Sequence, residues 1–399
     1  MVGKDTRKVF ATSSLGVVPL STAASTLILL DPSSTVSWLE ANTRINPYAH
    51  RCTPRFLSPA PTAGHTWWYE LETTNFSDGE TTIDKLEVLD ADTDDVVATL
   101  DAQEVAGRLQ AAGLREATDS LAPSTPARIF LHVIFGEAGE VPDRLVHRLS
   151  LEGKAIPSDQ QPLTEKVGPV KVDRRNAVEI GPPLRGSNYL AADSCCDATR
   201  HTRAALPVNG QVWIAQRYAV DWEQLDADGR LYSGEKQDPK SYTIYGQEVL
   251  AVADGTVVEV VDGLSDQVPG TYPEGISLDE ADGNAVILDL GGGNYANYAH
   301  LQPGSIRVHK GDRVNRGDVL GLVGNSGNSV APHLHFHVMS SPLFAASNGL
   351  PYVIDSFTVT GRSTGTEAFD EAEVTPLEVD PVETVTDAMP LDQYVVSFE

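Results

Sequence analysis

Residues 324–338 read GNSGNSVAPHLHFHV, a glycine-rich turn that leads into an apolar run with three histidines. The histidines occupy every second position: His333, His335 and His337. Because alternate side chains of a β-strand point to one face, the three imidazoles should share a face while the apolar residues between them enter a core. Imidazole is a common metal ligand and general base. The chain has 10 histidines, so three within this short run predict a metal or catalytic site rather than a chance arrangement on a strand edge.

Five segments upstream of this run carry related motifs. They are residues 249–258, 283–289, 295–301, 308–314 and 317–324. Together with the closing GNSG turn and the PHLHF sequence, they resemble, in the same order, the motifs of the lysostaphin-type (LytM-like) zinc endopeptidases. That family cuts peptide cross-links in bacterial cell walls. The resemblance covers residues 195–358, which is less than half of the chain.

The resemblance implies the fold of the C-terminal part. We predict an all-β protein in which residues 186–360 form a lysostaphin-type β-sheet peptidase domain, of the duplicated-hybrid-motif or barrel-sandwich type. Glycine turns of this kind also occur in lipoyl-carrier folds. Such a carrier would present a lysine after an aspartate in its turn, but Asp254 is followed by Gly255, so we set a carrier function aside.

Residues 35–156 predict a separate β-rich domain. Alternating patterns rich in aromatic and β-branched residues predict strands at residues 66–76, 81–89, 127–135 and 145–151. Apolar residues at helical spacing predict one helix at residues 103–112. Several short strands with turn signals are typical of an immunoglobulin-like β-sandwich. His132 and His147 lie in these strands and are expected to be hydrogen-bonded packing residues, so we interpret the domain as an accessory module.

Three further segments complete the predicted organisation. Residues 1–34 combine a basic start with a longer uncharged stretch, which predicts an N-terminal tail or a weak secretory signal. Residues 157–185 contain five prolines and mixed charges, which is linker composition. Residues 361–399 hold ten acidic residues against one arginine, and they predict an acidic, disordered tail.

The overall composition limits the partners. The chain has 29 basic and 56 acidic residues, a formal net charge of -27. Binding to a phosphate backbone requires a basic face, so nucleic acid is not expected, and we interpret the acidity as a solvated surface. After the N-terminal segment, no uninterrupted apolar stretch reaches the roughly 18 to 20 residues of a spanning helix, so no transmembrane span is expected. The sequence carries no marker of oligomeric state.

The cysteines bear on the compartment. Cys52 and the adjacent Cys195 and Cys196 lack the Cys-x-x-Cys spacing of a thiolate zinc site. A disulfide between Cys52 and one of the pair is one interpretation, and it requires an oxidising compartment. The other interpretation is that the three cysteines are small buried side chains. A cell-wall substrate, as the resemblance implies, predicts a secreted or cell-envelope protein, with a cytoplasmic location left open.

The resemblance also implies a metal site made of two histidines and an aspartate. Asp221 matches the aspartate, and His335, the second histidine of the His-x-His pair, matches one histidine ligand. His300 and His333 match the family's catalytic histidine pair. Zinc with three protein ligands keeps a fourth coordination position open, which is the arrangement of catalytic zinc sites.

One position departs from the family pattern. The first histidine ligand of the family lies four residues before the aspartate, and here that position is Arg217. Arginine has no lone pair with which to ligate a metal. His201 is the first candidate for the missing ligand. His337 is the second, although two residues along a strand span about 6.5 to 7 Å, so sharing one ion with His335 would require a bend or a bulge.

The predicted function is that of a zinc-dependent metalloendopeptidase. Zn²⁺ is assigned to His201, Asp221 and His335, while His300 and His333 would orient or deprotonate the attacking water and stabilise the oxyanion. The predicted partners are stem peptides or cross-bridges of peptidoglycan, or a similar extracytoplasmic peptide. The helical His-Glu-x-x-His motif of thermolysin-like enzymes is absent.

The alternative is a binding or regulatory module without metal. In that interpretation the peptidase domain is degenerate, keeps the groove and binds the cell wall without hydrolysis. Arg217 would then neutralise Asp221 where zinc would sit, and the two residues would form a buried salt bridge.

Overall fold

The structure is a computed structural model that describes residues 39–40, 65–135, 141–172, 176–195, 199–364, 374–378 and 382–399. The chain divides into a unit of residues 1–36 and a unit of residues 37–399. The predicted tail or signal segment, residues 1–34, lies outside the described residues. The regular secondary structure of the described part of the second unit is almost entirely β-strand, which confirms the predicted all-β class. Among the described residues, no helix has the length and apolar character that crossing a membrane requires.

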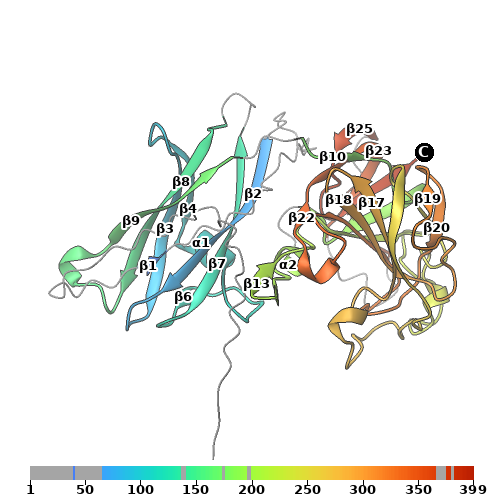
Figure 1. The fold of residues 1–399 in the computed structure, drawn as a ribbon, viewed down its shortest axis with the longest axis horizontal. Helices are drawn as coiled ribbons and strands as arrows, with labels where there is room; N and C mark the ends of the chain where they lie inside the picture. Colours follow the sequence, from blue (N-terminus) through green and yellow to red (C-terminus); the bar gives the residue numbers. More distant parts are fainter. Residues whose placement is uncertain are drawn as a thin grey trace, which may run out of the picture. The chain divides into compact units, whose positions relative to one another are not determined.

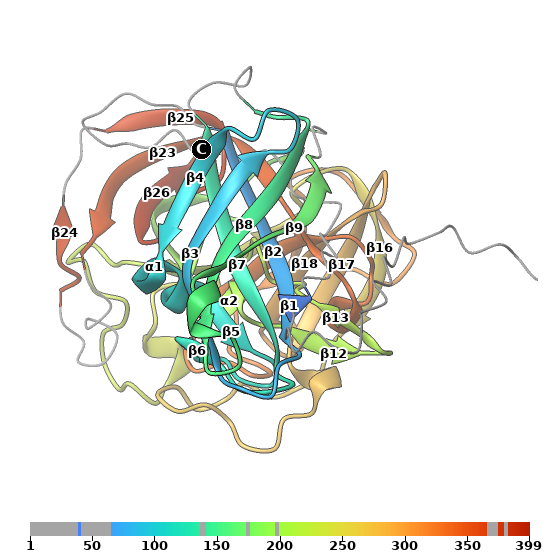
Figure 2. The ribbon, with the colours of Figure 1, turned by 90° about the vertical axis from the view of Figure 1, so that its left-hand side faces the viewer.

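Two antiparallel sheets build the N-terminal domain. Their strands are Leu39–Glu40 (β1), His65–Asn75 (β2), Thr81–Asp90 (β3), Val96–Asp101 (β4), Leu109–Ala111 (β5), Ser120–Leu121 (β6), Pro126–Phe135 (β7), Arg144–Gly153 (β8) and Leu163–Lys171 (β9). One sheet has the order β1-β2-β7-β5 and the other β4-β3-β8-β9, with β6 beside β3 (Figure 2). Leu71 of the first sheet and Leu86 of the second belong to one buried cluster, so the sheets share a core. The immunoglobulin-like topology stays a prediction.

Helix α1, Ala102–Arg108, begins at an N-cap that the sequence encodes. The Asp101 carboxylate accepts hydrogen bonds from two backbone N–H groups of the first turn, and the Glu104 carboxylate accepts one from the Asp101 N–H. This is a capping box. The helix predicted at residues 103–112 extends too far, because the backbone is already extended at Leu109, where β5 begins.

A second set of strands builds the C-terminal domain. They are Val178–Ile180 (β10), Gly186–Ala192 (β11), Leu206–Val208 (β12), Gln211–Trp213 (β13), Val220–Gln224 (β14), Glu248–Leu250 (β15), Gly255–Val261 (β16), Asn284–Gly291 (β17), Asn294–Leu301 (β18), Arg313–Val314 (β19), Val319–Leu322 (β20), Leu334–Met339 (β21), Gly349–Leu350 (β22), Tyr352–Ser363 (β23), Leu377–Glu378 (β24), Glu383–Ala388 (β25) and Tyr394–Phe398 (β26). Helix α2 spans Thr199–Thr202. Short 3-10 helices lie at Ser158–Gln160, Pro239–Ser241, Leu278–Glu280 and Phe344–Ala346.

One large sheet carries most of these strands. Its order is β10-β23-β26-β11-β14-β21-β18-β17-β16-β19, and Figure 1 shows β17 beside β18 within it. The strands β14, β21 and β18 are antiparallel neighbours. Along β14 and β21, Trp222, Leu334 and Phe336 are fully buried in the apolar core. The residues between them, including Asp221 and His335, therefore point to the opposite face.

Two segments predicted to be irregular contain strands. Within residues 157–185, the predicted linker, β9 pairs with β8 and β10 pairs with β23. Within residues 361–399, the predicted disordered tail, β25 and β26 pair with β23, and β26 also pairs with β11. Both predictions are wrong at these strands. In the tail, Val385 and Val396 enter the core, so a few apolar positions decide the structure although acidic residues dominate the composition.

Candidate metal and catalytic centre

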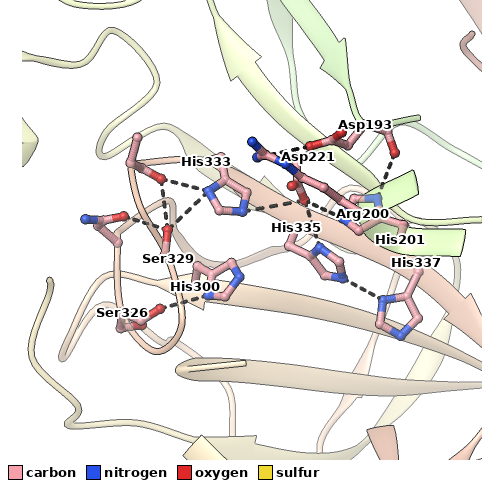
Figure 3. Close-up of polar contacts among 12 residues, drawn as sticks. Asp193, Arg200, His201, Asp221, His300, Ser326, Ser329, His333, His335 and His337 are labelled. Atoms are coloured by element: carbon pink, nitrogen blue, oxygen red, sulfur yellow. Dashed lines mark hydrogen bonds and ion pairs between the residues drawn. The ribbon is translucent and has the colours of Figure 1, made fainter. Parts of the chain in front are cut away.

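Three neighbouring strands place the predicted site residues on one face of the large sheet. Asp221 of β14 lies directly opposite His335 of β21, and His335 lies opposite Ala299 of β18. His300 follows Ala299, and His333 immediately precedes β21. Side chains of directly opposed residues in an antiparallel pair lie close together on one face. The pairing thus joins groups that are far apart in the sequence (Figure 3).

Donor atoms from three elements converge at Asp221. His335 Nδ1 lies 2.8 Å from Asp221 Oδ1, and His201 Nε2 lies 3.3 Å from the same oxygen. The ligand atoms of these three residues all lie within 4.8 Å of one another. With zinc–ligand bonds of about 2.0 to 2.1 Å, the edges of a tetrahedron measure roughly 3.3 Å. The separations are therefore compatible with a tetrahedral zinc site.

The orientation of His201 follows from a hydrogen bond on its far side. Its Nδ1 lies 2.7 Å from the carbonyl oxygen of Asp193. A carbonyl only accepts, so Nδ1 carries a proton, and Nε2 is the ring atom that faces the Asp221 carboxylate. Two lone pairs that face each other require a cation or a proton between them. This donor set therefore fits a metal ion.

The segment that leads to His201 begins at a disulfide. Cys195 is disulfide-bonded, and the other cysteines of the chain, Cys52 and Cys196, lie outside the described residues. Helix α2 follows and carries His201, whose side chain is almost fully buried. Cys195 is therefore not a free buried thiol, whereas its predicted pairing with Cys52 stays a prediction.

The charge of Asp221 governs the electrostatics of the site. Burial opposes the charged form of His201, but the Asp221 carboxylate raises the pKa of His201 to about 9. Burial also opposes ionisation of Asp221, yet His201 and His333 hold its pKa well below the usual range. A field that favours a proton between an imidazole and a carboxylate also favours a metal cation in the same place.

His300 and His333 form an imidazole pair beside these ligands, with ring centroids 4.7 Å apart. Their Nδ1 atoms lie 2.8 Å from the Ser326 carbonyl oxygen and 2.7 Å from the Ala331 carbonyl oxygen, respectively. Both rings therefore carry their proton on Nδ1 and keep a lone pair on Nε2. Burial lowers the pKa of both imidazoles, so both are neutral at neutral pH. The pair is equipped to accept protons.

A second combination of potential ligands, His300, His333 and His335, also brings its nitrogen atoms within 4.8 Å. It contains no anion, whereas the set with Asp221 supplies a carboxylate that offsets part of the metal charge.

The backbone of His300 has an unusual conformation. Its φ of 60° lies in the left-handed region that non-glycine residues rarely adopt. Strain of this kind is concentrated at functional sites.

Arg217 does not stand where the metal would bind. Its Nε and one terminal nitrogen donate to the two carboxylate oxygens of Glu70, at 2.7 and 2.8 Å, and its other terminal nitrogen donates to the Gly349 carbonyl. Both charged side chains are almost fully buried. The salt bridge between Arg217 and Asp221, which the alternative function required, is therefore not formed, and Asp221 remains directed at the histidines.

The structure places the two remaining described histidines of this domain, His337 and His309, away from Asp221 and the proposed metal position. His337 is buried, and its Nδ1 lies 3.0 Å from His335 Nε2, on the other side of the His335 ring from Asp221. His309 is exposed. The geometry thus brings together all five residues that the sequence singled out: His201, Asp221, His300, His333 and His335. Their roles as ligands and catalytic groups stay predictions.

Two acidic residues near the site were missed by sequence reasoning. Glu223 lies two positions after Asp221 on the same face of β14, and its Oε2 is buried without a hydrogen-bond partner. Burial raises the pKa of Glu223 well above its usual range. Asp193 contributes the carbonyl that orients His201. The strand spacing from Asp221 was a signal for Glu223, whereas nothing in the sequence marked Asp193.

The site opens into a cavity of about 1080 Å³. Its walls include the five site residues together with Glu223 and His337. The loop before β17 contributes Tyr272 and Leu278, which are exposed. A cavity of this size, lined by both imidazoles and apolar side chains, has room for a ligand larger than an ion or water.

Comparisons with known proteins agree with this geometry. Residues 241–345 match the profile of Peptidase family M23. The endolysin 2638A of Staphylococcus phage 2638A is 35% identical over 105 residues, 25% of this chain and 18% of that protein. The peptidoglycan DD-endopeptidase ShyA of Vibrio cholerae serotype O1 is 38% identical over 192 residues, 43% of this chain and 40% of that protein. The chain thus spans less than half the length of either relative.

Among solved structures, the catalytic domain of lysostaphin from Staphylococcus simulans is 22% identical, with a TM-score of 0.23, and the match covers 41% of this chain and 88% of that chain. The profile match at residues 241–345 includes His300, His333 and His335 but begins after His201 and Asp221. The profile match therefore does not cover the first two proposed ligands, whose assignment depends on the sequence resemblance at Asp221 and on the geometry of the site.

Proposed function

Because residues 241–345 form a domain of peptidase family M23, we propose that this protein is a zinc-dependent endopeptidase that hydrolyses peptide cross-links of peptidoglycan. One observation carries the proposal. His201 Nε2 and His335 Nδ1 both point at Asp221 Oδ1, at 3.3 and 2.8 Å, beside a second pair of neutral imidazoles. His201, Asp221 and His335 would hold the ion, with His201 in place of the ligand that is missing at Arg217.

When bound, zinc supplies Lewis-acid activation of the attacking water and of the scissile carbonyl. The chain's own residues move the protons. His300 and His333 each present an unprotonated Nε2, so either ring can accept the proton of the attacking water. Two charged rings at this separation repel each other, so only one is protonated at a time. That ring then donates its proton to the oxyanion or to the leaving amine.

The substrate class is supported by the relatives and by the cavity. The ShyA relative is described as a peptidoglycan DD-endopeptidase and the phage relative as an endolysin. A cavity of about 1080 Å³ above the histidines can take an extended peptide. A cell-wall substrate calls for a secreted or envelope-bound protein, and a disulfide at Cys195 is favoured in such an oxidising compartment.

Digestion of purified peptidoglycan tests this function. The zinc-loaded protein should lower the fraction of cross-linked muropeptide dimers and release one new amino group for each bond cut. A His335→Ala variant should lose this activity. His309→Ala is the matched control, because His309 is an exposed histidine of the same domain and should be dispensable. Dimers that persist after treatment with zinc-loaded wild-type protein would contradict the proposed function.

The metal-free binding module is not proposed as a second function. Its basis was an arginine that neutralises Asp221 in place of zinc. Arg217 is instead fully engaged by Glu70 and the Gly349 carbonyl.

A further inference from the structure

His337 is a buried histidine that the proposed reaction does not use. It lies two positions beyond His335 on the same face of β21 and is 1% exposed. Its Nδ1 is 3.0 Å from His335 Nε2, and the two rings meet edge to face, with an angle of 75° between their planes. Figure 3 shows His337 next to His335 and farther from Asp221 than His335 is. The contact therefore acts on the nitrogen of His335 that faces away from the proposed metal.

The direction of this hydrogen bond follows from the other side of the His335 ring. A neutral imidazole has one N–H and one lone pair. His335 Nδ1 lies 2.8 Å from Asp221 Oδ1, so in the metal site this nitrogen must offer its lone pair. The proton of His335 is then on Nε2, and it can only be donated to His337 Nδ1. His337 is thus the acceptor that matches the ligating form of His335.

His337 does not itself reach the proposed ion. Among the described residues, the groups of three or more potential ligands whose atoms lie within 4.8 Å of one another do not include it. The reason is the side of the ring that it meets: His337 contacts His335 Nε2, whereas Asp221 contacts His335 Nδ1.

The residue opposite His337 on the neighbouring strand carries an unpaired polar atom. Asn297 of β18 is the register partner of His337, and its amide nitrogen donates to Asp282 Oδ2 at 2.6 Å. Its carbonyl oxygen Oδ1 is buried without a hydrogen-bond partner among the described residues, and so is His337 Nε2. If His337 Nδ1 accepts from His335, then Nε2 carries the proton, and this N–H is not hydrogen-bonded to Asn297.

We infer that His337 is a positioning residue of the zinc site: it accepts the Nε2 proton of His335 and thereby fixes the ring with Nδ1 directed at the metal. This inference rests on the proposed zinc function. Partners of this kind fix both the tautomer and the orientation of a ligating histidine, and their loss weakens metal binding by about 10-fold to 100-fold.

Three substitutions separate hydrogen bonding from packing. In His337→Asn, the amide oxygen occupies the position of Nδ1 and keeps an acceptor for His335. His337→Leu removes every polar atom at similar volume. His337→Gln is polar as well, but its amide lies one bond farther from the backbone, so it offers no acceptor at the Nδ1 position. If the leucine variant fails to fold, the comparison of asparagine with glutamine carries the test.

The measurement is the zinc dissociation constant, determined by competition with a chromogenic chelator, together with the imidazole ¹⁵N shifts of His335 in the zinc-loaded protein. We expect zinc binding to weaken about 10-fold to 100-fold in the leucine and glutamine variants and to stay near the wild-type value in the asparagine variant. The ¹⁵N shifts of the wild type should report a protonated Nε2.

Equal zinc affinity in all four proteins would overturn the positioning role and leave the proposed function intact. Equal and complete loss of zinc in all three variants would also overturn it, because it would identify His337 as a ligand. A wild-type protein that binds no zinc would contradict the proposed function itself and this inference with it. The wild-type titration therefore tells the two failures apart.

Discussion

Two buried histidines, one in each described domain, show what separates a packing residue from a site residue. His147 of β8 uses both ring nitrogens: Nδ1 donates to the Gly168 carbonyl at 3.1 Å, and Nε2 accepts from the Tyr69 hydroxyl at 2.8 Å. His333 Nδ1 contacts the Ala331 carbonyl at 2.7 Å, while its Nε2 faces a carboxylate, with Asp221 Oδ1 at 3.5 Å. Burial lowers the pKa of both rings.

The difference lies in the unused nitrogen. His147 is saturated by the protein, so it confirms the prediction that this residue is a hydrogen-bonded packing residue. In the C-terminal domain, His201, His300 and His333 each contact a backbone carbonyl through Nδ1, and within the described part of the chain none of their Nε2 atoms contacts a backbone group: those of His201 and His333 face the Asp221 carboxylate. Burial alone does not distinguish the two settings, whereas the count of satisfied nitrogens does.

The largest expected effect comes from the proposed ligands. Asp221→Ala and His335→Ala should abolish peptidoglycan hydrolysis, because His300 and His333 would then act on water that no metal activates. The rate should fall by at least about 10⁴-fold, the largest usual contribution of a single general acid or base. Muropeptide analysis by chromatography measures the rate. If either variant kept activity within tenfold of the wild type, the activation free energy would have changed by only about 1.4 kcal/mol. That result would contradict the assignment of these residues to a functional site.

The proposed acid–base pair should have a smaller effect of a different kind. His300→Ala and His333→Ala should each lower kcat by about 10² to 10⁴-fold, the usual contribution of a general acid or base. Zinc content should remain that of the wild type, since neither residue is a proposed ligand. The rate assay checks the expected loss of kcat, and metal analysis checks that zinc is retained. Loss of zinc in His333→Ala would assign it to the metal and favour the second combination of ligands.

Arg217 should contribute to the stability of the fold rather than to metal binding. Arg217→Ala leaves the Glu70 carboxylate buried without its partner, and such a broken buried pair costs about 3 to 5 kcal/mol of unfolding free energy. Denaturant titration measures the loss. The double variant Glu70→Leu with Arg217→Met should recover much of it, because no buried charge is left unpaired. Zinc lost from a folded Arg217→Ala protein would contradict the separation of this arginine from the site.

The smallest effect is a pH dependence from the packing histidine. The pKa of His147 is lowered from 6.5 to about 4 by burial, so the unfolded chain binds a proton at higher pH than the folded one. Its stabilising contribution is complete above pH 6.5 and is lost as the pH falls toward 4, by about 3 kcal/mol in total. Unfolding free energies between pH 7 and 4 measure this slope. His147→Gln should flatten it, and an unchanged slope would contradict the assignment.

The sequence predicted the centre of the C-terminal domain better than its edges. The alternation of His333, His335 and His337 with apolar residues predicted one face of a strand, and β21 confirms it for His335 and His337, while His333 immediately precedes the strand. Asp221 was paired with His335 by resemblance, and the strand register places them opposite each other. Short-range periodicity carries this information because β-strand side chains repeat every two residues.

Long-range pairing could not be predicted in the same way. The many acidic residues at 361–399 led to a prediction of disorder and masked the apolar face of β26. That face can be recognised only when its neighbouring strands, β11 and β23, are known. The partner of Arg217, Glu70, lies 147 residues away in another domain, and no local pattern joins them. The Asp193 carbonyl that orients His201 belongs to the backbone, so no pattern of side chains predicted it.

The central claim is that His201 replaces the ligand absent at position 217, and zinc titration of three proteins tests it most directly. Wild type and His309→Ala should each bind about one zinc per chain, whereas His201→Ala should lose it in the presence of a competing chelator. His309 is the matched control because its side chain is 90% exposed. One zinc bound to His201→Ala with wild-type affinity, or none bound to the wild type, would contradict the account.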